Sequence, residues 1–354
     1  MSFDASTLDL AALGVEAFLT AEPSNVRYLT GFTGSNGLVL VEGGRMTLFT
    51  DPRYTIQASS EFSGPVEVIK RGGLPLAAAK LITRRKLRKV GFEKNRLSYA
   101  GHAALTAALD KKAELVALDD VIETLRMVKT PEEIAKIRHS VNLNSQAYLR
   151  ALQRFRPTMT EAALAAEIDY QMRRLGADGP AFDTIVASGP RTALPHAHPG
   201  ANPIQPNQLL LIDMGAMVDG YASDMTRTLV VGRISGALKR MYAAVLEAQL
   251  AAIARIKPGV SGGQIDREAR DVLKSHGLDK EFVHSTGHGL GLEIHEGPRL
   301  GKSEKRKLEA GMVITIEPGV YREGVGGVRI EDTVLVTASG PEVLTPTPKE
   351  LMSI

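Results

Sequence analysis

Apolar residues in the last third of the chain gather in short runs that have the pattern of strands, with polar turn residues between them. Residues 208–231 and residues 311–336 each show two such runs joined by a turn. The pair Asp219-Gly220 is a strong two-residue turn signal in the first segment. A longer, glycine-rich turn centred on Gly324 separates the two runs of the second segment. The sequence therefore predicts two β-hairpins in this part of the chain.

Each strand of the two predicted hairpins carries an acidic residue among positions that favour burial. With the two-residue turn in place, Asp213 lies opposite Thr226, and Asp213 and Asp224 become diagonal neighbours on one face. Diagonal neighbours have Cβ atoms roughly 7–8 Å apart or less. In a second hairpin that is symmetric about its central glycine, Glu317 and Glu331 also share a face. The pattern predicts a cage of four carboxylates.

Four converging carboxylates would repel one another, and a buried carboxylate without a partner is costly. We therefore predict that one or two metal ions neutralise the cage. His288 is the candidate nitrogen ligand, because the flanking Gly287 and Gly289 allow unusual backbone angles and close approach. Four carboxylates with one imidazole form an oxygen-rich set, which favours Mn²⁺, with Co²⁺, Zn²⁺ and Fe²⁺ as alternatives.

The first 125 residues alternate short apolar runs with helical patterns. Residues 37–50 have the pattern of a hairpin that turns at Gly43-Gly44. Further strand-like runs lie at residues 66–69, 90–92 and 115–118, and helical runs lie at residues 52–62, 74–86 and 98–109. The alternation predicts an α/β domain with a mixed sheet.

Capping signals mark where three later helices begin. Residues 130–133 (TPEE) form a capping box with proline at the first helical position. Thr158 and Glu161 show the same spacing before the next helical stretch. Ser261 and Gln264 show it before a third.

Length and composition set the broad class of the protein. At 354 residues, with 44% hydrophobic and 23% charged residues, the chain has the composition of a globular protein with about two domains. We place the domains at residues 1–125 and 126–354. The net charge of +3 gives no sign of a nucleic-acid partner, and the basic run within residues 84–89 is interpreted as the solvated end of a helix.

The chain contains no cysteine, which excludes disulfides and thiol catalysis and fits a reducing compartment. Residues 1–14 lack the basic and apolar segments of a signal peptide. No apolar run approaches the length of a membrane span. We therefore expect a cytoplasmic protein with no membrane partner.

Four motifs carry a resemblance to a known family. They are IDMGAMVDGYASDMTRT, STGHGLGLEIHE, TIEPGVY and GVRIED, all within residues 212–332. These motifs resemble the metallopeptidases of the pita-bread fold, which include aminopeptidase P, methionine aminopeptidase and, most similar, prolidase (Xaa-Pro dipeptidase). The family's metal ligands match five residues of this sequence: Asp213, Asp224, His288, Glu317 and Glu331.

The resemblance implies an α+β protein with a C-terminal pita-bread (creatinase/aminopeptidase-like) catalytic domain and a smaller N-terminal α/β domain. The stretch NVRYLTGFTGSNG, followed by TDPRYTIQA, resembles the N-terminal domain of prolidases and aminopeptidase P. Methionine aminopeptidases generally lack that domain, so its presence counts against them. A homodimer is expected from the resemblance alone.

The resemblance also implies roles for residues beside the metal ligands. His196, in the motif ALPHAHP, and His295 match histidines that contact substrate near the metals. His284 matches a position close to the cage, whose residue supports the metal ligands without binding the metals itself. Arg329 is a candidate to bind the carboxylate of the prolyl product. The alternative is that Arg329 only forms a salt bridge and holds Glu331 in place.

One position departs from the family pattern. Where the family often has an aromatic residue, typically tyrosine, this chain has Val218. A phenol that would hydrogen-bond near the metals is therefore missing, which bears on substrate recognition more than on the chemistry. Asp178 and Asp183 are interpreted as loop residues without a role in the site.

The chemistry implied by the resemblance uses two divalent metal ions per subunit, with Mn²⁺ expected and Co²⁺ or Zn²⁺ as alternatives. Two ions bind one water between them and lower its pKa, and the bridging hydroxide attacks the scissile carbonyl. Glu317 is expected to carry a proton from the water to the leaving nitrogen. His196 or His295, together with a metal, is expected to stabilise the oxyanion.

We therefore predict a dinuclear metal-dependent Xaa-Pro dipeptidase, which cuts the bond before a C-terminal proline in a dipeptide or short peptide. The alternative is an aminopeptidase P, which cuts the same bond in longer peptides and often carries a larger N-terminal domain. A third hypothesis is a non-catalytic peptide-binding module on the same fold. Such proteins typically lose metal ligands, and all five are present here.

Overall fold

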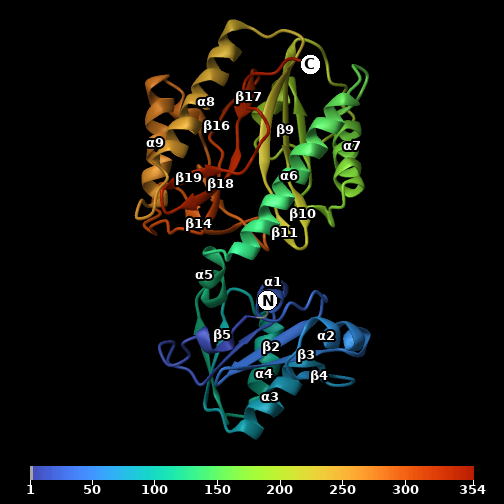
Figure 1. Ribbon diagram of the computed structural model, residues 1–354, viewed down its shortest axis with the longest axis vertical. Helices are drawn as coiled ribbons and strands as arrows, with labels where there is room; N and C mark the ends of the chain where they lie inside the picture. Colours follow the sequence, from blue (N-terminus) through green and yellow to red (C-terminus); the bar gives the residue numbers. More distant parts are fainter. Residues whose placement is uncertain (1–2) are drawn as a thin grey trace. The chain divides into compact units, whose positions relative to one another are not determined.

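The computed structural model describes residues 3–354, and the chain divides into two compact units, Met1–Arg126 and Met127–Ile354. Both units combine helices with strands (Figure 1). Each unit has hydrophobic cores of its own: Phe18 and Phe49 are buried in the first unit. Within the described residues, no helix combines the length and the apolar character needed to span a membrane.

A six-stranded sheet forms the centre of the N-terminal unit, in the order β4-β3-β2-β1-β5-β6. Its strands are β1 (Ala17–Thr20), β2 (Gly37–Glu42), β3 (Arg45–Thr50), β4 (Val66–Val68), β5 (Lys89–Glu93) and β6 (Glu114–Leu118). The pairs β1–β5, β5–β6 and β3–β4 are parallel, and the pairs β1–β2 and β2–β3 are antiparallel. The predicted mixed sheet is confirmed, as is the turn at Gly43-Gly44, where both residues have positive φ.

Five α-helices lie in the part of this unit that the structure describes. They are α1 (Pro23–Thr30), α2 (Thr55–Glu61), α3 (Gly73–Arg85), α4 (Tyr99–Leu109) and α5 (Val121–Met127). The basic run closes α3, with Arg84 and Arg85 in its last turn, as predicted. The prediction did not include β1, α1 or α5. All four residues of β1 are buried, and a strand so short shows no alternation by which it could be recognised.

Two pairs of helices flank the strands of the C-terminal unit, α6 with α7 and α8 with α9 (Figure 1). Their bounds are α6 (Pro131–Gln153), α7 (Glu161–Arg174), α8 (Gly236–Arg255) and α9 (Gly262–Ser275). Thr130 and Ser261 begin α6 and α9 through the predicted capping boxes. Helix α8 was not predicted from the sequence.

The predicted start of α7 was wrong. Its N-cap is Thr160, whose hydroxyl oxygen accepts a hydrogen bond from the Ala163 N–H at 3.1 Å. Glu161 is therefore the first residue of the helix, not the third residue after a cap at Thr158. A carboxylate at the first position does not return to the cap, so the side chain of Glu161 is available for contacts elsewhere.

Thirteen strands of the C-terminal unit form two three-stranded sheets, one five-stranded sheet and one two-stranded sheet. They are β7 (Gly179–Pro180), β8 (Ile185–Ser188), β9 (Gln208–Met214), β10 (Ala216–Val218), β11 (Tyr221–Ala222), β12 (Met225–Val231), β13 (Gly287–Gly289), β14 (Glu296–Leu300), β15 (Val313–Ile316), β16 (Gly319–Arg322), β17 (Gly326–Arg329), β18 (Asp332–Thr337) and β19 (Gly340–Val343). The first predicted hairpin runs through β9–β12, and the second runs through β15–β18.

The first hairpin has the predicted register. Asp213 pairs with Thr226, and Val218 pairs with Tyr221. The turn between them is Asp219-Gly220, with φ of 49° and 74°. Positive φ at both central residues is what a tight hairpin turn of this kind requires.

The second hairpin is symmetric about Gly324, as predicted. Arg322 pairs with Gly326 next to the turn, and Val313 pairs with Leu335 far from it. In each pair, the two residues are equally far from position 324. The pairing of β15 with β18 and the pairing of β16 with β17 therefore share one register.

Three of the five expected ligands stand where the strand ladders are interrupted, whereas Asp213 lies within β9 and His288 within β13. Glu317 lies between β15 and β16, Glu331 between β17 and β18, and Asp224 between β11 and β12. At two of the breaks the backbone N–H bonds outside its own hairpin: Glu317 to the Thr286 carbonyl at 2.8 Å, and Glu331 to the Thr226 carbonyl at 3.1 Å. The breaks free these carboxylates from the strand pairing and let them turn toward one another.

Candidate metal centre and active site

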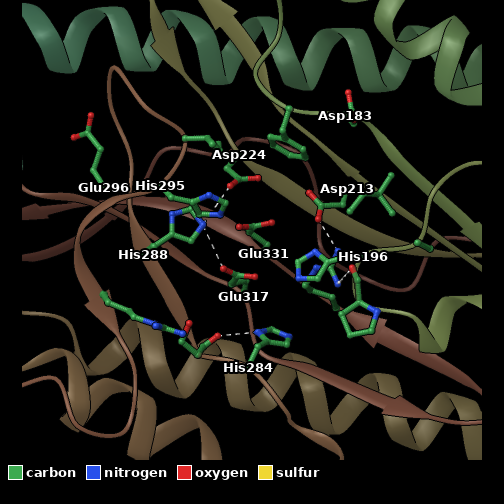
Figure 2. A pocket seen from close by; sticks show the side chains of 18 of the residues that line it. Asp183, His196, Asp213, Asp224, His284, His288, His295, Glu296, Glu317 and Glu331 are labelled. Atoms are coloured by element: carbon green, nitrogen blue, oxygen red, sulfur yellow. Dashed lines mark hydrogen bonds and ion pairs between the residues drawn. The ribbon is translucent and has the colours of Figure 1, made fainter. Parts of the chain in front are cut away.

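The two hairpins and β13 bring the expected ligands to one place (Figure 2). One ligand atom from each of Asp224, His288 and Glu331 lies within 4.8 Å of the other two. His288 Nε2 is 3.6 Å from Asp224 Oδ2 and 3.5 Å from Glu317 Oε1. Figure 2 shows Asp213 at the edge of the same cluster.

The hydrogen bond of the His288 imidazole favours the tautomer whose Nε2 is free to bind a metal. Its Nδ1 lies 3.0 Å from the carbonyl oxygen of Gly289. A carbonyl oxygen only accepts hydrogen bonds, so Nδ1 carries the proton and Nε2 presents a lone pair to the carboxylates. Burial, with His295 close by, lowers the pKa of His288 to about 4, so the ring is neutral at neutral pH.

The carboxylates of the cluster are buried and repel one another. Burial raises the pKa of Asp224 and of Glu331 well above their ordinary values, and the neighbouring carboxylates add to both shifts. Burial likewise raises the pKa of Glu317 to about 7. One hydroxyl offsets part of this cost, because Thr226 Oγ1 donates to Glu331 Oε2 at 2.7 Å. A divalent cation would remove the repulsion.

Asp213 gives the clearest sign that the cluster fits a metal. Its Oδ2 accepts a hydrogen bond from Arg329 Nη2 at 2.5 Å. Its Oδ1 is buried and has no hydrogen-bond partner among residues 3–354. A buried carboxylate oxygen in that state is costly unless something else binds it. The unpartnered oxygen, the other carboxylates and the imidazole lone pair form a donor set suited to divalent ions.

Arg329 lies on the ligand side of β17, but its guanidinium is already engaged. The side chain is 3% exposed. Nε donates to Thr226 Oγ1 at 3.1 Å, and Nη2 donates to Asp213. Nη1 donates to the Tyr321 hydroxyl at 2.7 Å and to the Pro195 carbonyl at 3.3 Å. Four of the five N–H groups of an arginine are thereby used, which favours a role in holding Asp213 over binding of a product carboxylate.

His284 stands at the end of a hydrogen-bond chain that leads through Tyr321 and Arg329 to the cluster. Its Nδ1 donates to the Ser285 carbonyl at 2.8 Å, so its Nε2 accepts from the Tyr321 hydroxyl, also at 2.8 Å. The Tyr321 oxygen accepts in turn from Arg329. Burial lowers the pKa of His284 to about 4 and raises that of Tyr321 to about 12. The arrangement fits the supporting role expected for His284.

A cavity of about 660 Å³ opens onto the cluster. His196 and His295 both line it, as does His198. The ring of His295 packs edge-on against that of His288, with centroids 4.3 Å apart. In the view of Figure 2, His196 lies on the opposite side of the carboxylates. Apolar side chains form another part of the wall: Phe182, Ile185, Pro195, Ala197 and Ile294.

Three charged residues line this cavity although the sequence assigned them no role: Asp183, Glu296 and Arg299. Glu296 pairs with the buried Lys129 at 3.2 Å. Arg299, on β14, is exposed and forms no ion pair with the described residues. No motif marks Arg299 in the sequence, and only its position in space connects it with the site. Val218, where the family often has an aromatic residue, is buried and does not line the cavity.

Comparison with known proteins identifies the family. Residues 135–338 match metallopeptidase family M24, and residues 8–128 match the creatinase/prolidase N-terminal domain. This chain belongs to metallopeptidase family M24. A relative of this M24 metallopeptidase, the Xaa-Pro dipeptidase of Pyrococcus furiosus, is 39% identical over 339 residues, which cover 96% of this chain and 95% of the relative.

Solved structures match this M24 metallopeptidase over nearly its whole length. An Xaa-Pro dipeptidase from Bacillus anthracis is 40% identical, with a TM-score of 0.93, over 99% of this chain and 97% of that one. An X-Pro aminopeptidase from Thermotoga maritima is 36% identical, with a TM-score of 0.90, over 96% of this chain and 98% of that one. The predicted α+β pita-bread fold and the predicted metallopeptidase family are confirmed. Family membership implies divalent metal ions in the site.

Proposed function

We propose that this M24 metallopeptidase is an Xaa-Pro dipeptidase, which hydrolyses the bond before a C-terminal proline in a dipeptide. The observation that carries the proposal is the buried carboxylate and imidazole cluster, with its unpartnered Asp213 oxygen, at a cavity that also presents His196, His295 and Arg299. The relatives described as Xaa-Pro dipeptidases, 39% and 40% identical over nearly the whole chain, support the same substrate class.

In this proposal five residues hold two divalent ions: Asp213, Asp224, His288, Glu317 and Glu331. Mn²⁺ is the proposed ion, because four of these five ligands are carboxylates and hard oxygen donors suit it, with Co²⁺ or Zn²⁺ as alternatives. When bound, the ions supply Lewis acidity that polarises the scissile carbonyl and makes a water acidic enough to act as a nucleophile.

The protein's own groups handle the protons and the developing charge. Glu317 takes a proton from the attacking water and returns it to the prolyl nitrogen as the C–N bond breaks. That nitrogen has no proton in the substrate, because proline forms a tertiary amide. N–H groups of His196 and His295 donate hydrogen bonds to the oxygen that becomes negative when the carbonyl carbon turns tetrahedral. Both rings line the cavity from which the substrate reaches the cluster.

A dipeptidase also has to recognise the free carboxylate that follows proline. Arg329 was the candidate from sequence, yet its N–H groups are directed at Asp213, Tyr321 and Pro195. We propose Arg299 for this role instead. Arg299 lines the same cavity and has no carboxylate partner among the described residues, and a planar guanidinium suits a carboxylate.

The test is hydrolysis of Ala-Pro beside Ala-Pro-Ala, with the metal-free protein reloaded separately with Mn²⁺, Co²⁺ or Zn²⁺. We expect kcat/KM at least tenfold higher for the dipeptide and the highest rates with Mn²⁺. A higher kcat/KM for the tripeptide would identify the aminopeptidase alternative, to which the 36% identical X-Pro aminopeptidase gives weight. If neither peptide is hydrolysed, the hypothesis of a non-catalytic peptide-binding module remains.

We further propose that the enzyme works in the cytoplasm as a homodimer. A chain without cysteine has no disulfides that an oxidising compartment would maintain, which supports the location. Light scattering of the purified protein tests the dimer, and fractionation of cells that express it tests the compartment.

A further inference from the structure

The segment that carries His196 into the cavity is held by a side chain from a different element. This segment, the His196 loop (residues 189–203), forms most of the connection between β8 and β9 and contains a single 3₁₀ turn, Gly189–Ala193. It has no strand of its own to fix its position. The carboxylate of Glu161, at the start of α7, meets both ends of it.

Glu161 is fully buried, with 0% of its surface exposed. On one side of the loop, its Oε1 accepts hydrogen bonds from the Ser188 N–H at 2.8 Å and from the Ser188 hydroxyl at 3.0 Å. On the other side, its Oε2 accepts from the Gly200 N–H and from the Asn202 side-chain amide, both at 3.3 Å. One carboxylate thereby ties together two points of the chain that lie before and after His196.

Arg191 extends this anchor toward the middle of the loop. Its Nε donates to both oxygens of Glu161, at 3.2 and 3.0 Å. Its Nη2 donates to the carbonyl oxygen of His198 at 2.7 Å. The guanidinium therefore transmits the position of Glu161 to the residue two places beyond His196.

The backbone at the start of α7 completes the attachment. The N–H of Glu161 donates to the Asn202 carbonyl, and the N–H of Ala162 donates to the Gly200 carbonyl, both at 3.0 Å. These first N–H groups of a helix have no partner within the helix, so the loop satisfies them. A carboxylate at this end is also favoured by the helix dipole.

A capping role alone does not account for these contacts. A capping carboxylate bonds to its own helix, whereas every side-chain hydrogen bond of Glu161 comes from Ser188 or from the His196 loop. A neutral side chain at this position would accept these hydrogen bonds more weakly, and it would weaken the contacts from Arg191, Gly200 and Asn202, which are partly buried.

We infer that Glu161 is a positioning residue for the reaction, which sets the place of His196 in the cavity by holding both ends of its loop. This inference rests on the role proposed for His196. Glu161 touches neither the substrate cavity nor the carboxylate cluster, so its effect is transmitted through the loop. A misplacement of about 1 Å costs on the order of 100-fold in rate.

Glu161→Gln keeps the shape of the side chain but turns an N–H₂ group toward donors. Hydrogen exchange followed by mass spectrometry measures the loop without reference to activity. We expect amides of residues 189–203 to exchange at least tenfold faster in Glu161→Gln, with no change in the five-stranded sheet. Glu167→Gln is the matched control, because Glu167 is on the same helix and, within residues 3–354, its side chain bonds to Arg154 and Gln171 and to nothing in the His196 loop.

The kinetic arm uses the Mn²⁺-loaded enzyme and Ala-Pro. We expect Glu161→Gln to keep its metal content and to lower kcat by about 10- to 100-fold, with KM changed less than threefold. The same substitution in a His196→Ala background should cost less than threefold, because the residue that it positions is gone. Glu161→Asp should restore part of the rate.

Equal losses of kcat in the two backgrounds, or unchanged exchange in the His196 loop, would overturn the inference. If the wild-type enzyme does not hydrolyse Ala-Pro, the proposed function is overturned instead. The hydrogen-exchange measurement then decides by itself whether Glu161 holds the loop. If Glu161→Gln does not fold, Arg191→Met gives the same test, since the Arg191 side chain is 35% exposed and its loss removes the link to His198.

Discussion

Exchanging Arg299 for methionine separates recognition of the substrate carboxylate from support of the metal cluster. The substitution keeps a long unbranched side chain and removes the charge. Hydrogen bonds to charged groups contribute about 1.5–3 kcal/mol. Arg299 is exposed at the cavity, and solvent screens such contacts, so the lower end applies. About 1.5 kcal/mol corresponds to about a tenfold loss of kcat/KM for Ala-Pro.

The assay compares the free acid Ala-Pro with its C-terminal amide on Mn²⁺-loaded protein. Arg299→Met should raise KM for the acid and leave the amide within about twofold. Arg329→Met is the matched comparison, because Arg329 is buried and bonded to Asp213. Its loss should reduce hydrolysis of the acid and the amide to the same degree. Equal losses on both substrates for Arg299→Met, or a loss confined to the acid for Arg329→Met, would contradict the roles assigned to the two arginines.

Three further outcomes are expected. Asp224→Ala should lose metal and activity together while far-ultraviolet circular dichroism stays unchanged, because the apolar cores do not include Asp224; mass spectrometry that finds full occupancy and normal turnover would contradict this. His196→Ala should keep both metals and lose mainly kcat, and an unchanged kcat would leave His196 a structural role. Burial raises the pKa of Glu93 to about 8, above its ordinary 4.5, so the folded state keeps a proton that the unfolded chain has lost between these values. The stability of the N-terminal unit should therefore fall as pH rises from about 4.5 to about 8. Glu93→Gln should reduce that fall in urea unfolding at pH 5 and pH 8, and parallel pH dependences would argue against it.

Local turn chemistry explains why the hairpins could be predicted from the sequence. Asp219-Gly220 dictates a two-residue turn, and that turn alone sets Asp213 opposite Thr226. In the second hairpin, the turn centred on Gly324 sets the register in the same way. Because side chains alternate strictly along a strand, a correct register determines which acidic residues meet.

Contacts between distant parts of the chain could not be predicted from local sequence patterns. Glu161 fits a capping box by spacing, but its donors lie 27 to 41 residues further along the chain. Arg329 was expected beside Glu331, and it pairs with Asp213, 116 residues away. Arg299 carries no motif at all. In each case the surroundings of the side chain are set by packing between distant segments, which a local sequence pattern does not encode.

The ladder breaks at Asp224, Glu317 and Glu331 bear on how this fold can evolve. The strands on each side of a break keep their own pairing, so the sheets do not depend on the residues that stand between them. Side chains at the breaks can therefore be exchanged by single substitutions with little effect on the scaffold. A lineage that abandons metal chemistry, or acquires another reaction, needs no new backbone, only new residues at positions that the hairpins already leave free.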